Sequence, residues 1–226
     1  MSIRRIMLFI GPPGSGKGTL SQLCAQKLGW EQISTGDLCR QHMAGGTEIG
    51  KKIDFAIKSG KLVSDDLISA MVFDWLKNRK SGSDTIIFDG YPRTVQQVED
   101  FRRMLAELDG SIELIVVTFD IDDDTIIDRL SNRYVCQNKS CQRIYSLRPG
   151  SPLAPRQNML CDSCGNPLER RKDDDPAAIK ERLKVYHQHE QELLSYYRCM
   201  GYDIRTLKSN MPVDQLFNQY TKMVEG

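Results

Sequence analysis

The sequence lacks long hydrophobic runs, an excess of charge of either sign, and internal repeats. Its first apolar run, residues 6–10, stops at Gly11 and is too short for a secretion signal or a membrane span, so we expect a cytoplasmic protein with no membrane partner. Lysine and arginine number 31 and aspartate and glutamate 30, so no overall field draws the chain to nucleic acid. Any binding of phosphate must therefore be local.

Histidines are few and cysteines are odd in number. We expect the three histidines to be surface residues, because they lie outside every motif described below: His42, His187 and His189. Seven unevenly spaced cysteines argue against the disulfide framework of a secreted protein. Three of them are isolated, and we expect them to be ordinary apolar side chains: Cys24, Cys39 and Cys199.

The other four cysteines lie between Tyr134 and Asp175, where the apolar periodicity disappears. They form two pairs that are typical of a structural zinc ribbon, because four thiolates make a closed tetrahedral site: Cys136 with Cys141, and Cys161 with Cys164. The segment has little core of its own, so a bound metal would be what folds it. Two disulfides or four buried thiols are the alternatives.

A glycine-rich loop follows the first apolar run and leads into a segment of helical periodicity. The loop reads Gly11-Pro12-Pro13-Gly14-Ser15-Gly16-Lys17-Gly18-Thr19. Strand, loop and helix in this order predict a phosphate-binding loop, in which backbone N–H groups and a helix N-terminus face phosphate oxygens and Lys17 adds a full charge. The hydroxyl that follows the lysine comes one position later than in the general motif, at Thr19. The alternative is a glycine-rich turn without a ligand.

Strand and helix patterns alternate along the rest of the chain. The strands are expected at residues 85–88, 112–119 and 203–207, and helical periodicity covers 67–76, 98–108, 179–193 and 213–220, with Ser64 and Asp175 as N-caps. This alternation predicts an α/β fold with a central parallel sheet flanked by helices. Asp89 follows a strand, where a carboxylate is suited to hold Mg²⁺ through water; the alternative is a turn aspartate before Gly90.

With these motifs assembled, the chain resembles adenylate kinases of the bacterial long-lid type with a zinc-binding lid. The resemblance rests on the order of four motifs: Gly14-Ser15-Gly16-Lys17-Gly18-Thr19, Ser34-Thr35-Gly36-Asp37, Phe88-Asp89-Gly90-Tyr91-Pro92-Arg93-Thr94 and Arg171-Lys172-Asp173-Asp174. It implies a P-loop kinase core (1–33, 64–131 and 175–226), a helical AMP-binding segment (34–63) and an inserted zinc-ribbon-like lid (132–174). It also implies a monomer that converts ATP and AMP to two ADP with Mg²⁺.

The resemblance implies the following site residues. ATP would contact Gly14, Ser15, Gly16, Lys17, Gly18, Thr19, Arg129, Arg133, Ile144, Tyr145 and Met211. AMP would contact Thr35, Arg40, Lys61, Leu62, Val63, Gly90, Tyr91, Pro92, Arg93, Gln97, Arg171 and Arg182. Charge on the transferred group would be stabilised by Lys17, Arg93, Arg129, Arg133, Arg171 and Arg182, which agrees with the need of phosphoryl transfer for alignment and neutralised oxygens. Asp173 and Asp174 would form hinge or lid-closing pairs.

Two alternatives remain open at this point. One is a different nucleoside monophosphate kinase; Thr35 and Gln97 favour AMP, because relatives that act on pyrimidine monophosphates typically carry alanine and asparagine there. The other is a P-loop module whose zinc ribbon binds nucleic acid through its basic residues: Arg133, Lys139, Arg143, Arg148 and Arg156. The neutral net charge and the lack of aromatic side chains beyond Tyr134 and Tyr145 argue against it.

Overall fold

A computed structural model of the chain describes residues 3–58, 63–79, 82–108, 111–138 and 141–225. Lys61, Leu62 and Lys139 lie outside the described residues. Within the described part, no helix combines the length and the apolar character that crossing a membrane requires.

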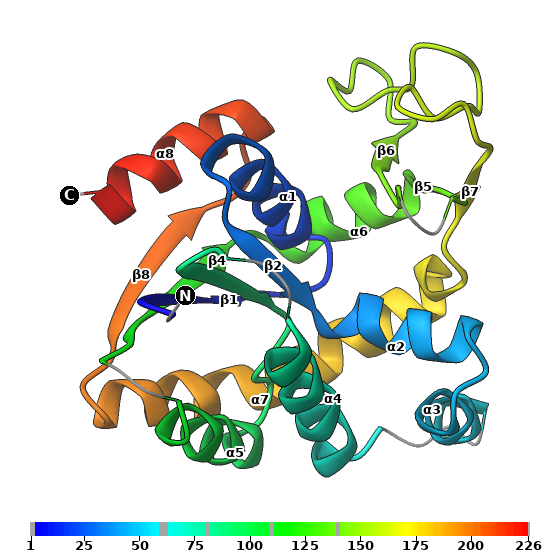
Figure 1. Ribbon diagram of the computed structural model, residues 1–226. Coiled ribbons are helices and arrows are strands. Elements are labelled where there is room, and N and C mark those ends of the chain that lie inside the picture. Colours follow the sequence, from blue (N-terminus) through cyan, green and yellow to red (C-terminus); the bar gives the residue numbers. More distant parts are fainter. Residues whose placement is uncertain (1–2, 59–62, 80–81, 109–110, 139–140, 226) are drawn as a thin grey trace.

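The core is built on a five-stranded parallel sheet in the order β2-β3-β1-β4-β8 (Figure 1). Its strands are β1 (Arg5–Ile10), β2 (Glu31–Ser34), β3 (Thr85–Asp89), β4 (Glu113–Asp120) and β8 (Asp203–Lys208). The central strands are apolar on both faces because helices cover both, and this confirms the predicted parallel sheet. Periodicity did not predict β2, whose only buried apolar side chain is Ile33.

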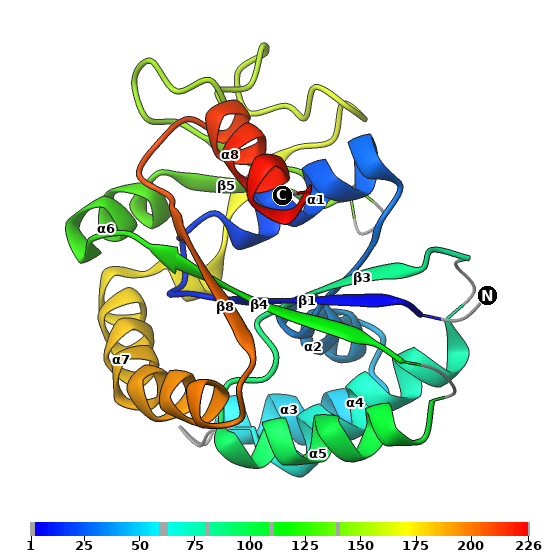
Figure 2. The same cartoon turned by 90° about the vertical axis from the view of Figure 1, so that its left-hand side faces the viewer.

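Helices cover the two faces of the sheet in separate groups (Figure 2). One face packs against α1 (Lys17–Leu28) and α8 (Val213–Glu225), with Phe9, Leu20 and Phe217 in the shared core. The opposite face packs against α4 (Asp65–Asn78), α5 (Val95–Ala106) and α7 (Pro176–Cys199). A further helix, α6 (Asp123–Ser131), packs on the start of α7.

The two predicted N-caps differ. Asp175 accepts a hydrogen bond from the Ala177 N–H at 2.9 Å, as expected for a cap of α7. Ser64 occupies the predicted cap position of α4, but its side chain makes no cap hydrogen bond. Instead, its main-chain carbonyl accepts hydrogen bonds from the N–H groups of Leu67 and Ile68.

Two segments extend from the core toward the same side in Figure 1. The first contains α2 (Thr35–Ala44) and α3 (Glu48–Lys58). The second, which we call the lid, carries an antiparallel sheet in the order β6-β5-β7, with strands Ile144–Ser146, Arg133–Cys136 and Leu168–Arg170, and ends in a 3-10 turn, Lys172–Asp174. The buried cluster of the lid is small: Cys136, Tyr145, Cys161 and Leu168.

Candidate functional site

The glycine-rich loop joins the end of β1 to the first residue of α1. Gly14 and Gly16 have φ of 81° and 98°, a left-handed conformation that favours glycine. Gly14 also lacks room for a side chain, because a Cβ there would lie 2.9 Å from Leu130 Cγ. The Ser15 N–H closes the turn on the Pro12 carbonyl at 3.2 Å. The local sequence therefore dictates the tight loop that was predicted, with the N-terminus of α1 at its end.

Lys17 is buried within this loop. Its ammonium donates to the carbonyls of Gly11 and Pro12, both at 2.7 Å, and to Ser15 Oγ at 3.2 Å. Burial lowers the pKa of Lys17 to about 8, with Asp89 acting in the opposite direction. A cation held in this way is placed to meet an anion rather than bulk water.

Asp89 lies at the carboxyl end of β3, beside the loop. It pairs in register with Ser34 of β2, and a Cβ on Gly18 would lie only 3.2 Å from its Oδ2 atom. Glycine at that position therefore lets the carboxylate approach the start of α1. Burial raises the pKa of Asp89, and Lys17 opposes that shift. Thr19 and Asp89 both line the cavity described next and offer the hard oxygen ligands that suit Mg²⁺.

A cavity of about 800 Å³ lies between the loop, α2 and the lid. Its charged lining is strongly positive, with seven arginines and Lys17 against four carboxylates. The arginines are Arg40, Arg93, Arg129, Arg133, Arg148, Arg171 and Arg182. Burial, and then the neighbouring Arg133 and Arg40, lower the pKa of Arg171 to about 10. Crowding of cations in a chain whose net charge is only +1 indicates a site for several anionic groups.

Several of these arginines are held in place by hydrogen bonds. Arg93 Nε donates to the Gly90 carbonyl, and Arg129 Nη2 donates to the Ser209 carbonyl, each at 2.7 Å. Arg133 makes a bidentate pair with Asp174, at 2.7 and 2.6 Å, and the Asp174 side chain has no exposed surface. Arg182 pairs with Asp173 at 3.1 Å. The two aspartates at the end of the lid thus join an arginine of the lid to one of α7.

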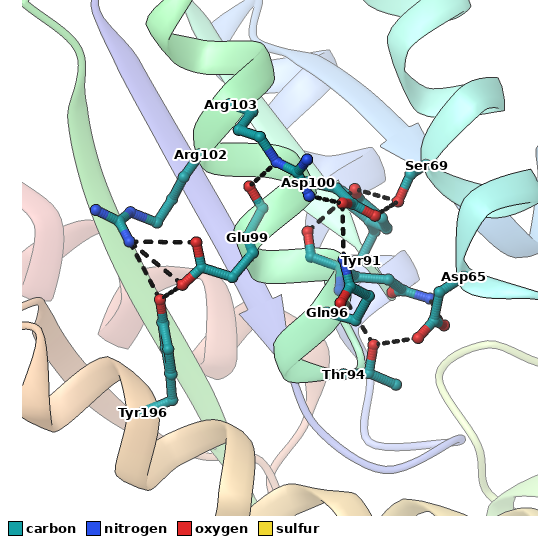
Figure 3. A network of polar contacts seen from close by, with 11 residues as sticks. Asp65, Ser69, Tyr91, Thr94, Gln96, Glu99, Asp100, Arg102, Arg103 and Tyr196 are labelled. Atoms are coloured by element: carbon teal, nitrogen blue, oxygen red, sulfur yellow. Dashed lines mark hydrogen bonds and ion pairs between the residues drawn. The ribbon is translucent and has the colours of Figure 1, made fainter.

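In the segment after β3, some residues line the cavity and others point into the core. Gly90 and Pro92 line the cavity, whereas the Tyr91 ring is buried and its hydroxyl lies 3.0 Å from Ser69 Oγ (Figure 3). Ser69 in turn donates to Asp100. The Tyr91 side chain therefore belongs to the core, and only its main chain can face a ligand.

Thr35 and Gln97 are also buried behind this wall. Thr35 Oγ1 donates to the Gly90 carbonyl at 2.8 Å. The Gln97 amide accepts from the Arg93 N–H at 2.8 Å and donates to Asp65 at 2.6 Å. Asp65 also accepts a hydrogen bond from Thr94 Oγ1 and was not predicted from the sequence. The one sequence feature that could have pointed to it is its position directly after Ser64, the expected N-cap. Among the described residues that were predicted to bind nucleotide, Ser15 and Val63 likewise do not line the cavity.

The lid supplies the other end of the cavity. Ile144 and Tyr145 of β6 line it, and Met211 lines it from the core side. Arg148, a basic residue of the lid, was not predicted to belong to the nucleotide site. In the structure its guanidinium lies 3.0 Å from Asp128 of α6 and lines the cavity.

The four lid cysteines converge. Their sulfur atoms all lie within 4.8 Å of one another, with 3.4 Å between Cys136 and Cys164 and 3.7 Å between Cys141 and Cys161. A disulfide requires an S–S distance of about 2.05 Å. Four thiolates around a tetrahedral zinc at about 2.3 Å would be about 3.8 Å apart, which is close to the spacing found. The cluster fits a structural zinc site, and four protein ligands leave no open position for substrate.

Comparisons with known proteins agree with this geometry. The sequence profile of the family described as adenylate kinase matches residues 9–202. The adenylate kinase of Kosmotoga olearia is 36% identical over 220 residues, which cover 97% of this chain and 99% of that protein. That of Methanothrix thermoacetophila is 36% identical over 218 residues, with 96% and 97% covered. That of Symbiobacterium thermophilum is 38% identical over 212 residues, with 93% and 94% covered. With its phosphate-binding loop, arginine-lined cavity and matching length, the chain belongs to the adenylate kinase family.

Proposed function

We propose that this chain transfers the terminal phosphoryl group of ATP to AMP, reversibly and with Mg²⁺, inside the arginine-lined cavity. The observation that carries the proposal is the convergence of Lys17 and seven arginines on one cavity of about 800 Å³. Two nucleotides bring several phosphate groups together, and their mutual repulsion must be neutralised before the reacting oxygens can align. A strongly positive cavity in a nearly neutral chain supplies that neutralisation.

On the ATP side, the loop and the lid would hold the donor. Backbone N–H groups of residues 14–19 and the Lys17 ammonium would bind its phosphates, and Arg129 and Arg133 would orient them. Ile144, Tyr145 and Met211 would contact the base. Thr19 and, through water, Asp89 would hold Mg²⁺, which when bound neutralises charge on the phosphate oxygens.

On the AMP side, Arg40 and Arg93 would hold the phosphate, with the main chain of residues 90–92 beside it. Arg171 and Arg182, which also line the cavity, would stabilise the charge of the group in transfer. Thr35 and Gln97 would recognise the base. Each end of the Gln97 amide already has one partner, the Arg93 N–H at its oxygen and Asp65 at its nitrogen, which leaves one N–H and one lone pair for adenine.

The division of the chain follows from these roles. We propose a core of residues 1–33, 64–131 and 175–226, an AMP-binding segment of 34–63 and a lid of 132–174. Closure of the lid would exclude water, which could otherwise accept the phosphoryl group. Zinc held by the four cysteines would stiffen the lid without taking part in the reaction. We further propose that the protein acts as a cytoplasmic monomer and binds no nucleic acid.

The decisive experiment is a coupled assay for ADP. We expect ADP formation to require ATP, AMP and Mg²⁺ together, and AMP to be preferred over CMP, UMP and GMP at fixed ATP. The preference follows from Thr35 and Gln97, whose hydroxyl and amide can form hydrogen bonds with the edge of adenine. Arg93→Ala should lower the rate by about 10²-fold or more, because it removes a charge from the phosphate site. A wild-type chain that makes no ADP would refute the activity, and preference for another acceptor would refute the specificity.

The pH dependence should report on Lys17. Burial lowers the pKa of this lysine to about 8. The protonated form binds phosphate, so kcat/KM for Mg·ATP should fall as the pH rises through about 8. Bound phosphates favour the protonated lysine, so the fall in kcat should begin at higher pH than the fall in kcat/KM. Profiles measured between about pH 6 and 10 test this, and a kcat/KM that stays flat across that range would contradict it.

A further inference from the structure

Tyr145 belongs to two sites at once. It lies in β6, it lines the nucleotide cavity, and the residue is 3% exposed. The rest of its surroundings is the buried cluster of the lid, which includes Cys136, Cys161 and Leu168. No other tyrosine among the described residues of the lid combines contact with the cavity and contact with the cysteine cluster.

The hydroxyl of Tyr145 is held at both its donor and its acceptor side. It donates to the Cys161 sulfur at 3.3 Å and accepts from the Asp162 N–H at 2.7 Å. A tyrosine hydroxyl has one proton to donate, so the bond to Cys161 uses its whole donor capacity. The position of the ring therefore depends on the position of that sulfur.

A metal that binds Cys161 keeps its sulfur deprotonated, and a thiolate accepts a hydrogen bond more strongly than a thiol does. Groups that hydrogen-bond to a metal ligand orient the ligand and tune its affinity. A sulfur anchored in a closed four-cysteine site also restrains the hydroxyl that donates to it. The ring attached to that hydroxyl forms part of the cavity wall on the side where the donor nucleotide would lie.

We propose that Tyr145 is a positioning residue that couples the lid metal to the donor nucleotide. Its hydroxyl orients Cys161 toward the metal, and the metal-anchored hydroxyl holds the ring as a wall of the ATP half of the cavity. This proposal rests on the proposed function only in assigning ATP to that half. Because coupling between two bound ligands is reciprocal, ATP should tighten zinc binding by the factor by which zinc tightens ATP binding.

The test uses Tyr145→Phe in the full-length chain, which keeps the ring and removes the hydroxyl. Tyr134→Phe is the matched control. Tyr134 lies opposite Tyr145 in the lid sheet and packs on the same cluster, but no hydrogen bond among the described residues involves its hydroxyl. Zinc affinity is measured by competition with a chromogenic chelator, without nucleotide and again with saturating ATP.

We expect Tyr145→Phe to bind zinc about 10- to 100-fold more weakly than wild type in the absence of nucleotide. In the wild type, ATP should tighten zinc binding by about 5-fold or more, and this factor should fall toward one in Tyr145→Phe. Tyr134→Phe should match the wild type in both measurements. Cobalt substitution gives a further readout, since the thiolate-to-cobalt absorption should shift in Tyr145→Phe and not in Tyr134→Phe.

Two results would overturn the proposal. One is a Tyr145→Phe chain that binds zinc as tightly as the wild type, and the other is a variant that retains the full effect of ATP on zinc affinity. The nucleotide-free zinc measurement does not depend on the enzymatic activity. A wild type that forms no ADP would therefore refute the proposed function while leaving the role of Tyr145 toward the metal to be judged by zinc affinity alone.

Discussion

Replacing Lys17 by methionine is expected to lower kcat about 10³-fold or more while the chain remains folded. Lys17 is the one lysine among the residues that line the cavity, and its ammonium lies in the phosphate-binding loop itself. Methionine retains most of the volume and removes the charge. Methionine cannot make the three hydrogen bonds of Lys17, but it also removes the cost of burying a charge, so we expect the melting temperature to stay within a few degrees of wild type.

The measurement combines steady-state ADP formation with thermal unfolding. Lys27→Met is the control, because Lys27 lies on the same helix, is exposed and does not line the cavity. It should retain wild-type activity. A Lys17→Met variant with near-normal kcat would show that the loop lysine does not act on the transferred phosphoryl group. A variant that is inactive because it no longer melts cooperatively would be separated from this case by the unfolding curve.

Loss of the lid metal should have the second large effect. We expect about one zinc per chain in the wild type and well below one in Cys161→Ser. Among the described residues of the lid, the buried cluster contains only four, so we expect the metal to supply most of the stability of this segment. Structural zinc contributes about 10–16 kcal/mol of apparent binding free energy in small zinc-dependent units, which is far more than such a cluster can replace.

Limited proteolysis is the measurement that locates this effect. Cleavage in Cys161→Ser should appear within residues 132–174 while the core remains intact, and ADP formation should fall by about 10-fold or more because an unfolded lid cannot exclude water. Cys199→Ser is the control, since Cys199 is exposed on α7 and outside the cluster. Full zinc content in Cys161→Ser, or a lid as resistant as that of the wild type, would contradict a structural metal site.

Short-range patterns in the sequence predicted much of the fold. The strands β1, β3, β4 and β8 were expected within two residues of their bounds. The first three are compact apolar runs between polar or turn residues, whereas only Ile204 and Leu207 are apolar in β8. The strand β2 was missed, because at the sheet edge only Ile33 needs to be apolar. The side chain of Ser64 was expected to cap α4, but it is the main-chain carbonyl of Ser64 that accepts hydrogen bonds from the first turn of the helix.

The candidate site likewise contains features that the sequence predicted and features that it did not. The glycine-rich loop and the four cysteines could be read from the sequence, since their chemistry depends on residues that are close together along the chain or on a donor set that is complete in itself. The resemblance to a family supplied the arginines. It did not reveal that the Tyr91 ring is turned into the core, that Gln97 is held between Arg93 and Asp65, or that Arg148 enters the cavity.

The sequence by itself determined the conformation of the glycine-rich loop and the candidate metal ligands of this protein. The left-handed glycines at positions 14 and 16 and the two cysteine pairs suffice for that, because steric freedom and thiolate chemistry act over a few residues. Only the tertiary structure decided which cations share a cavity and which are neutralised. Arg133 and Asp174 are 41 residues apart in the chain yet form a buried bidentate pair. Electrostatic interactions act through space, so the positive field at the phosphate loop exists only after β1, α2, α6 and the lid have come together.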